Sequence, residues 1–153
     1  RRIVSVHDEQ RRAFDESFAR AIEAPEPRIA LVGIQVASTR YLVRLDEVHS
    51  VAAAGIITPA PSSRSELVGI TSQRGRILAV FDLGALLGHP RGPAPAWIVI
   101  ARGQPIAFAV ATLEGHVTVP AAAVVEDNVQ LDGAVRPIVP LGRLVAKLVE
   151  KET

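Results

Sequence analysis

From Arg28 onward the chain is divided into short runs rich in Val and Ile, and this division limits what it can fold into. Seven such runs are IALVGIQV, RYLVRL, RILAVFDL, AWIVIA, PIAFAVA, HVTV and PIVPL. Most are too short for helices, and β-branched residues favour strands. The segments between them, such as PAPSSRS, GHPRGPAPA and EDNVQLDG, carry the Gly, Pro, Ser and Asn residues typical of turns. The pattern predicts a mainly β protein built as small barrels or a sandwich.

The N-terminal segment has helical periodicity instead. Phe14, Phe18 and Ile22 recur at a spacing of four after Ser5, which predicts an N-capped amphipathic helix ending near Glu23. The prolines of APEPR cannot continue it. Its apolar stripe either covers an open side of the β core, which is the commoner case, or docks a partner. We therefore expect a helix and Pro-rich linker over residues 1–27, followed by the β domain over residues 28–153.

A second helix is expected at the C-terminal end, LGRLVAKLVEKET. Its apolar residues at helical spacing are Leu141, Leu144, Val145 and Leu148.

A faint internal repeat relates the two halves of the chain. Shifted by 67 positions, Tyr41, Val43, Glu47 and His49 align with Phe108, Val110, Glu114 and His116. Shifted by 58 positions, Gly75, Val80, Leu83, Gly84 and Leu86 align with Gly133, Ile138, Leu141, Gly142 and Leu144. The repeat predicts two similar β subdomains, each ending in an LGxL helical turn.

Composition argues against several classes of protein. The 153 residues allow one compact unit, and no uninterrupted apolar run approaches the roughly 18 residues needed to span a bilayer. A chain without cysteine has no disulfide, thiolate metal site or cysteine nucleophile. A net charge of +1 with scattered arginines argues against strong binding to nucleic acid. We expect a cytoplasmic protein that does not bind nucleic acid and does not insert directly into a membrane.

No enzyme fingerprint is present. The four histidines, His7, His49, His89 and His116, are not spaced as zinc ligands on a helix. Nucleophile-elbow, phosphate-loop and dinucleotide-binding motifs are also absent from the sequence. We therefore expect no catalytic residue, no cofactor and no metal, and a structural or surface role for the histidines.

The segments YLVRLDEVHSV, ITPAP and LVGITSQRGRILAVFDLGALLG follow one another between Tyr41 and Gly88. This order resembles the CheW-like domain of bacterial chemosensory systems. In that family a V-x-E-I strand leads through a P-x-x-P-like loop to G-[VI]-x-N-x-R-G-x-[IV]-x-P-[VI]-x-D-[LV]. The residues that follow the second pattern are Gly69, Ile70, Arg74, Gly75, Ile77, Val80, Asp82 and Leu83. With WIVIARGQPIAFAVATLEGHVTV and PIVPLGRLV, the resemblance extends from about Ile29 to the C-terminal helix.

The resemblance implies two packed five-stranded SH3-like β barrels and a non-enzymatic adaptor. Family members join the cytoplasmic tip of a chemoreceptor to the regulatory domain of a histidine kinase, with the receptor in a groove between the barrels and the kinase on another barrel face. By position, Val48, Gly69 and Arg74 map to the receptor-side region, and Gln73 and Gly75 flank the arginine. These five residues are the candidate partner-binding site.

Arg74 has two interpretations on chemical grounds. Its guanidinium is a rigid fork of donors suited to a carboxylate or to carbonyl groups of another element. Alternatively, it ties the turn to the preceding strand. We also expect a positive φ at Gly75 and a helix-capping role for Asp82, just before Leu83.

The chain departs from the family pattern at several positions. Ser50 replaces the acid of V-x-E-I, Ser72 the asparagine, Gln73 a leucine, Ala79 the proline and Ala111 a second-half acid. The loop over 124–135 also looks shorter than usual. Two alternatives therefore stay open: a divergent CheW-like module that binds one partner only, and a small β barrel that binds a ligand or nucleic acid.

Overall fold

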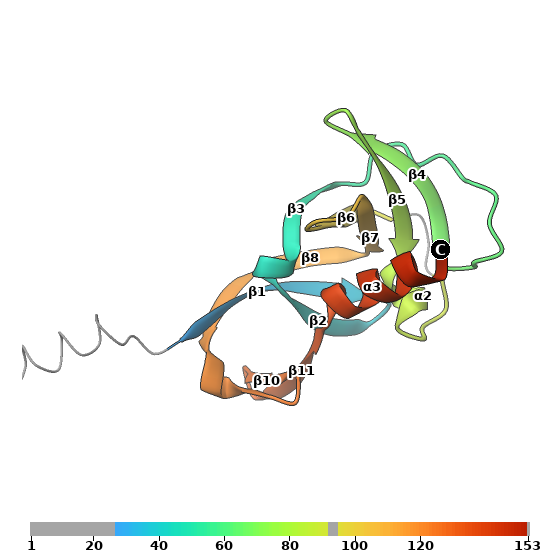
Figure 1. The fold of residues 1–153 in the computed structure, drawn as a ribbon. Helices are drawn as coiled ribbons and strands as arrows, with labels where there is room; N and C mark the ends of the chain where they lie inside the picture. Colours follow the sequence, from blue (N-terminus) through green and yellow to red (C-terminus); the bar gives the residue numbers. More distant parts are fainter. Residues whose placement is uncertain (1–26, 92–94, 153) are drawn as a thin grey trace, which may run out of the picture.

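The computed structural model describes residues 27–91 and 95–152, in which eleven strands form two sheets (Figure 1). The first sheet has the order β8-β1-β2-β11-β10-β9 and consists of β1 (Arg28–Val36), β2 (Thr39–Arg44), β8 (Thr112–Pro120), β9 (Val124–Val125), β10 (Asn128–Leu131) and β11 (Ala134–Val139). The second has the order β3-β6-β7-β5-β4 and consists of β3 (Val48–Ala53), β4 (Leu67–Gln73), β5 (Arg76–Asp82), β6 (Trp97–Ala101) and β7 (Ile106–Val110).

Short helical elements connect and close these strands. They are the 3-10 helices η1 (Leu45–Glu47) and η2 (Ala121–Ala123) and the α-helices α2 (Leu83–Leu86) and α3 (Leu141–Glu152). The predicted mainly β fold, with two small barrel-like sheets and a C-terminal helix, is confirmed. The helix expected from Ser5 to Glu23 lies outside the described residues. Within the described residues, no helix is both long enough and apolar enough to cross a membrane.

The order of the strands shows how the internal repeat is built. The first half of the chain runs β1 to β5 and then α2, while the second runs β6 to β11 and then α3. Each sheet combines the first two strands of one half with the later strands of the other half. The parallel pairs β2·β11 and β5·β7 join the halves at equivalent places. Neither half therefore forms a sheet alone, and each barrel contains strands from both.

The buried apolar side chains form three layers, one inside each barrel and one between the two sheets. One layer fills the first barrel, with Leu31, Leu42, Val119, Val129 and Ile138, and one fills the second, with Ala54, Leu78, Val80, Ile98, Ile100, Ala107 and Ala109. A larger layer between the sheets contains Phe81, Phe108 and Leu141. Strand side chains alternate between faces, so β7 contributes Phe108 to the shared layer and Ala107 to the barrel. This double role explains why all five residues of β7 are buried.

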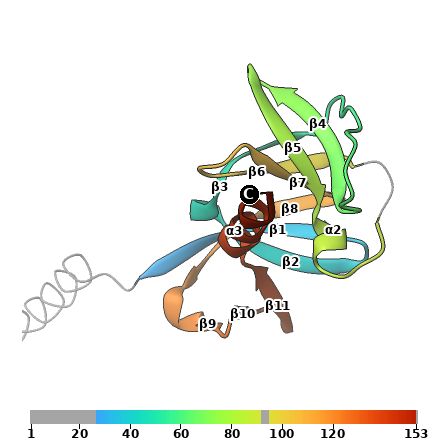
Figure 2. The same ribbon diagram turned by 45° about the vertical axis from the view of Figure 1, so that its right-hand side comes forward.

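Helix α3 packs into the layer between the sheets and is seen nearly end-on in Figure 2. Leu141, Val145 and Leu148 from its apolar face are buried there, as the spacing predicted, and Leu144 packs at the edge of the same layer. Burying a leucine of this kind contributes about 1.5–3 kcal/mol. The last element of the chain is therefore part of the core that joins the barrels.

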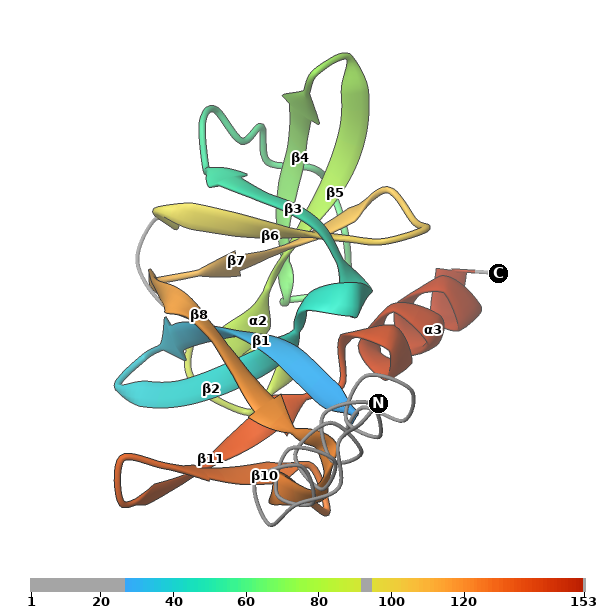
Figure 3. The ribbon, with the colours of Figure 1, turned by 90° about the vertical axis from the view of Figure 1, so that its left-hand side faces the viewer.

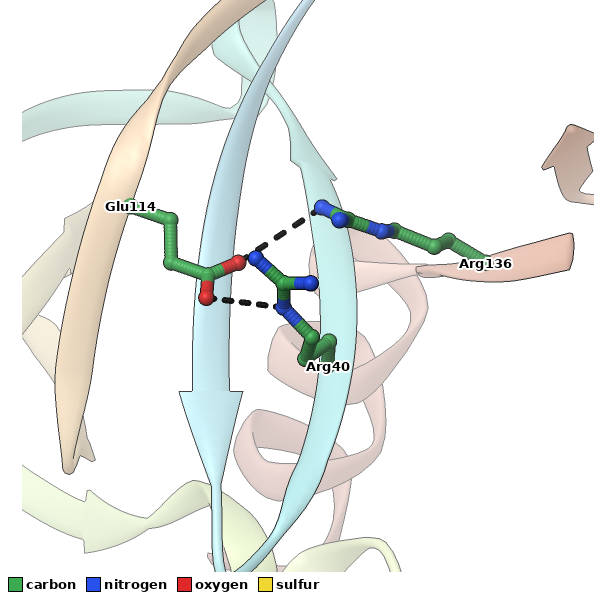
Figure 4. A network of polar contacts seen from close by, with 3 residues as sticks. All are labelled: Arg40, Glu114 and Arg136. Atoms are coloured by element: carbon green, nitrogen blue, oxygen red, sulfur yellow. Dashed lines mark hydrogen bonds and ion pairs between the residues drawn. The ribbon is translucent and has the colours of Figure 1, made fainter. Parts of the chain in front are cut away.

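A charged cluster joins β8, β2 and β11 of the first sheet across β1 (Figure 4). Glu114 of β8 reaches across β1, where its Oε2 accepts a hydrogen bond from Nε of Arg40 on β2 at 2.8 Å. Its Oε1 lies 3.5 Å from Nη1 of Arg136 on β11. A Cβ at Gly33 of β1 would lie only 3.1 Å from the Glu114 Cβ. Gly33 therefore leaves the space through which the glutamate reaches both arginines.

Two hairpins project from opposite ends of the molecule, β4–β5 from the second barrel and β10–β11 from the first (Figure 3). The β4–β5 hairpin carries most of the residues that the sequence singled out. At the other end of β5, the Asp82 Oδ1 accepts a hydrogen bond from the Ala85 amide at 3.4 Å. The predicted cap at the start of α2 is thus confirmed.

Candidate partner-binding site

The turn of the β4–β5 hairpin consists of Arg74 and Gly75 alone. Gln73 pairs with Arg76 across it, and the two turn residues have φ of 51° and 79°. Two successive positive φ values define the tight turn whose twist matches a β-hairpin. The expected positive φ at Gly75 is confirmed. An arginine in the left-handed region costs about 1–2 kcal/mol, so the turn holds Arg74 in an unfavourable backbone conformation.

A cavity of about 290 Å³ lies between this hairpin and β3. Its lining residues are His49, Ser50, Val51 and Ala52 of β3, Ile100 of β6, and Gln73, Arg74, Arg76 and Leu78 of the hairpin region. Since β3 and β4 are the two edge strands of the second sheet, the cavity lies where these edges approach each other. Of the five predicted site residues, the structure places Gln73 and Arg74 on this cavity and Gly75 beside them.

Arg74 has no internal partner in the described part of the chain. Its side chain is exposed, and no hydrogen bond or ion pair to residues 27–91 or 95–152 holds its guanidinium. The guanidinium thus makes no contact that would tie the turn to the preceding strand. The N–H donors of the Arg74 guanidinium are therefore available to another molecule at the rim of the cavity.

The charged side chains that line the cavity are all positive. Arg74 and Arg76 both line it, and the arginine guanidinium stays protonated in proteins. His49 adds a third basic side chain, while no aspartate or glutamate is among the lining residues. The position where the family pattern has an acid, Ser50, belongs to the same cavity. The substitution therefore removes the carboxylate that would otherwise face these arginines.

Val48 and Gly69 serve the fold around this cavity instead of lining it. Val48 is 4% exposed, its side chain packs between the sheets, and its carbonyl oxygen accepts a hydrogen bond from Arg102 Nη2 at 3.1 Å. Gly69 lies in β4 against the preceding loop, where an added Cβ would be 2.2 Å from the Thr58 carbonyl oxygen. Neither side-chain position is available to a partner in this structure.

Sequence reasoning missed Arg76 and His49 as members of the site. The pairing of β3 with β6 shifts between Val48 and Ser50, which makes His49 the extra residue of a bulge. Bulges re-aim side chains, and here His49 lines the cavity. Arg76 could have been found from strand alternation, because it lies on the same face of β5 as the cavity residue Leu78.

A larger groove of about 610 Å³ lies between the two sheets on another part of the surface. It is lined by Val36 and Ala37 from the end of β1, by Ile57, Pro59 and Val68, and by the β7 end with Ala109, Val110 and Ala111. The charged residues that line it are Asp82 and Arg91. Ala111, one of the departures from the family pattern, thus makes this groove less acidic.

In the described ranges no group of three or more His, Cys, Asp or Glu side chains is arranged to hold a metal ion. His89 has a structural role, since its Nε2 and the Tyr41 hydroxyl are hydrogen-bonded at 2.8 Å. The two barrels thus carry two hollows of different character, a cationic cavity and a largely apolar groove.

Comparison with known proteins identifies the family. A model of the CheW-like domain matches residues 30–148, and the chain belongs to the CheW-like domain family. The fold is similar to the crystal structure of the scaffolding protein TtCheW from Thermoanaerobacter tengcongensis, with a TM-score of 0.64 and 22% identity over 73% of this chain and 88% of that chain. No curated protein sequence matches the chain. The family is one of non-catalytic scaffolding proteins, which supports a general role in chemosensory coupling and argues against an enzyme.

Proposed function

We propose that this chain is a non-enzymatic adaptor that couples chemoreceptors to a histidine kinase by docking both. Its partners are the cytoplasmic tip of a chemoreceptor and the regulatory domain of the kinase, and it acts in the cytoplasm without a cofactor. The observation that carries the proposal is Arg74, which has no internal partner in the described residues and lies at the rim of a cavity beside its hairpin turn. The groove between the sheets supplies a second surface.

The chemistry of the two surfaces indicates which kind of partner each one would bind. The apolar groove suits a partner that buries hydrophobic side chains, and the cationic cavity suits one that presents polar or acidic groups. Residues 28–153 form the adaptor domain in this proposal, and residues 1–27 precede it as a helix and linker.

A pulldown with purified fragments tests the proposal. The full chain is immobilised and exposed to the receptor tip and to the kinase regulatory domain encoded beside it. We expect both to bind and Arg74→Glu to weaken at least one. Arg143→Glu is the matched control, because the Arg143 side chain is 75% exposed on α3 and does not line the cavity.

The other outcomes separate the alternatives. Retention of the kinase fragment alone would favour a module with one partner. Failure of a well-folded protein to bind either fragment would overturn the adaptor function.

A further inference from the structure

We propose that the cavity between β3 and the β4–β5 hairpin binds an acidic segment of a protein partner, with an apolar side chain inserted and carboxylates paired with Arg74 and Arg76. The inference rests on the proposed function and specifies the chemistry of one docked partner. The carboxylate partner of the arginines is then supplied by another molecule and not by this chain.

The first argument for the proposal is the charge of the residues at the rim of the cavity. Arg74 and Arg76 lie within one cavity of about 290 Å³, and no acidic residue lines it. Among the described residues neither guanidinium has a hydrogen-bonded or ionic partner. Four other arginines are paired with acids: Glu114 contacts Arg40 and Arg136, and Asp127 contacts Arg44 and Arg143. The two cavity arginines differ from these in having their charge uncompensated.

The second argument is the apolar character of the residues at the floor and wall of the cavity. Leu78 is 1% exposed and Ile100 is 5% exposed, and both also belong to the core of the second barrel. Val51 of β3, which is 42% exposed, adds an apolar wall. Leu78 and Ile100 are already shielded from water, so Val51 is the apolar surface that a purely ionic ligand would leave hydrated and an aliphatic side chain would bury. The complementary segment therefore carries an apolar residue flanked by acids.

The third argument concerns Ser50, which lines the same cavity. A carboxylate at this position would compete with the partner's carboxylate for the arginines. The small hydroxyl leaves both the space and the positive potential open.

The test uses the full chain and a defined probe, a terminally blocked Glu-Glu-Leu-Glu-Glu peptide. Backbone amide signals are followed by NMR during titration at low and at high salt. We expect the peptide to shift the signals of His49 to Ala52 and of Gln73 to Arg76, and added salt to weaken the binding because exposed charges are screened. A Lys-Lys-Leu-Lys-Lys peptide and a Glu-Glu-Ser-Glu-Glu peptide are controls for charge and for the apolar side chain.

Two substitutions at one exposed position make the test specific. Ser50→Glu places a competing carboxylate in the cavity and is expected to lower the affinity for the acidic peptide on the order of fivefold, the effect of one exposed ion pair. Ser50→Gln adds nearly the same volume without charge and is expected to retain most of the affinity. Arg74→Gln and Arg76→Gln should each weaken binding, and Arg143→Gln should not.

Equal affinities of the Ser50→Glu and Ser50→Gln variants would overturn the inference, as would equal binding of the basic peptide. Absence of any shift at the cavity would also overturn it. These results are distinct from failure of the adaptor function: if receptor and kinase fragments bind equally well to the Ser50→Glu variant and the wild type, the adaptor stands and the acidic-segment site does not.

Discussion

Gly75 and Gly133 occupy the same position in the turns of the two projecting hairpins, each with φ of 79°. The residues before them, Arg74 and Asp132, also match, with φ of 51° and 50°. Both turns contain two residues, between Gln73 and Arg76 in one hairpin and between Leu131 and Ala134 in the other. The repeat at 58 positions is therefore preserved in backbone conformation as well as in sequence.

Alanine at either turn glycine should destabilise the fold by a similar amount. At φ of 79° no atom lies within 4 Å of an added Cβ, so the cost comes from the backbone alone, about 1–2 kcal/mol. Urea unfolding of Gly75→Ala and Gly133→Ala measures it. Gly55→Ala is the control, because Gly55 has equal space and no positive φ. If the control lost as much stability as the turn variants, the conformational explanation would fail.

Arg74→Asn should raise stability while it weakens partner binding. Asparagine is favoured at the first position of this turn, so the substitution relieves backbone strain worth up to about 1 kcal/mol. It also removes the guanidinium from the cavity rim. Urea unfolding and the pulldown should therefore change in opposite directions. Asp132→Asn, at the equivalent turn, is expected to leave both nearly unchanged; loss of stability in Arg74→Asn would contradict the strain argument.

Gly69→Ala should be the most destabilising of the glycine substitutions. The added Cβ would lie 2.2 Å from the Thr58 oxygen and 2.8 Å from the Thr58 carbon, which are backbone atoms. Thr58 cannot easily move, because it exchanges two backbone hydrogen bonds of 2.8 Å with Ile70. Overpacking against backbone costs about 1–3 kcal/mol or more. Urea unfolding beside Gly55→Ala tests this, and an effect no larger than the control would show that the loop yields.

The sequence located seven of the strands in the described residues but missed β3, β4, β9 and β10, the last of which lies in EDNVQLDG, a segment predicted as a turn; it also did not indicate how the strands pair. Val and Ile runs locate strands because alternating faces must be buried, and Gly75 locates a turn, which the structure shows to join two strands as a hairpin. Nothing local indicates that β2 pairs with β11, since Leu42 and Ile138 meet only in the folded chain. The exchange of strands between halves therefore followed from tertiary structure alone.

The candidate site was predicted in part for the same reason. Arg74 and Gln73 were found because the turn motif is contiguous in the sequence. His49 and Ser50 come to the same cavity only through the strand order of the second sheet. Val48 lies next to them in sequence, but its side chain packs in the core, because the bulge at His49 shifts the register by one residue and so changes the face on which the following side chains lie.

The cluster around Glu114 should be worth more to stability than its exposed contacts suggest. Arg136 is only 13% exposed, so Glu114→Gln leaves a largely buried cation without its counter-charge and should cost about 2 kcal/mol. Arg40→Gln removes only the contact of a side chain that is 53% exposed and should cost less than about 1 kcal/mol. Urea unfolding of both variants tests the ranking. A double-mutant cycle tests the interaction directly. The variant with both Glu114→Gln and Arg136→Gln should lose less stability than the sum of the two single losses, because the unpaired cation is then gone. Strict additivity would mean that Glu114 and Arg136 do not interact and that Glu114 stabilises the sheet by another route.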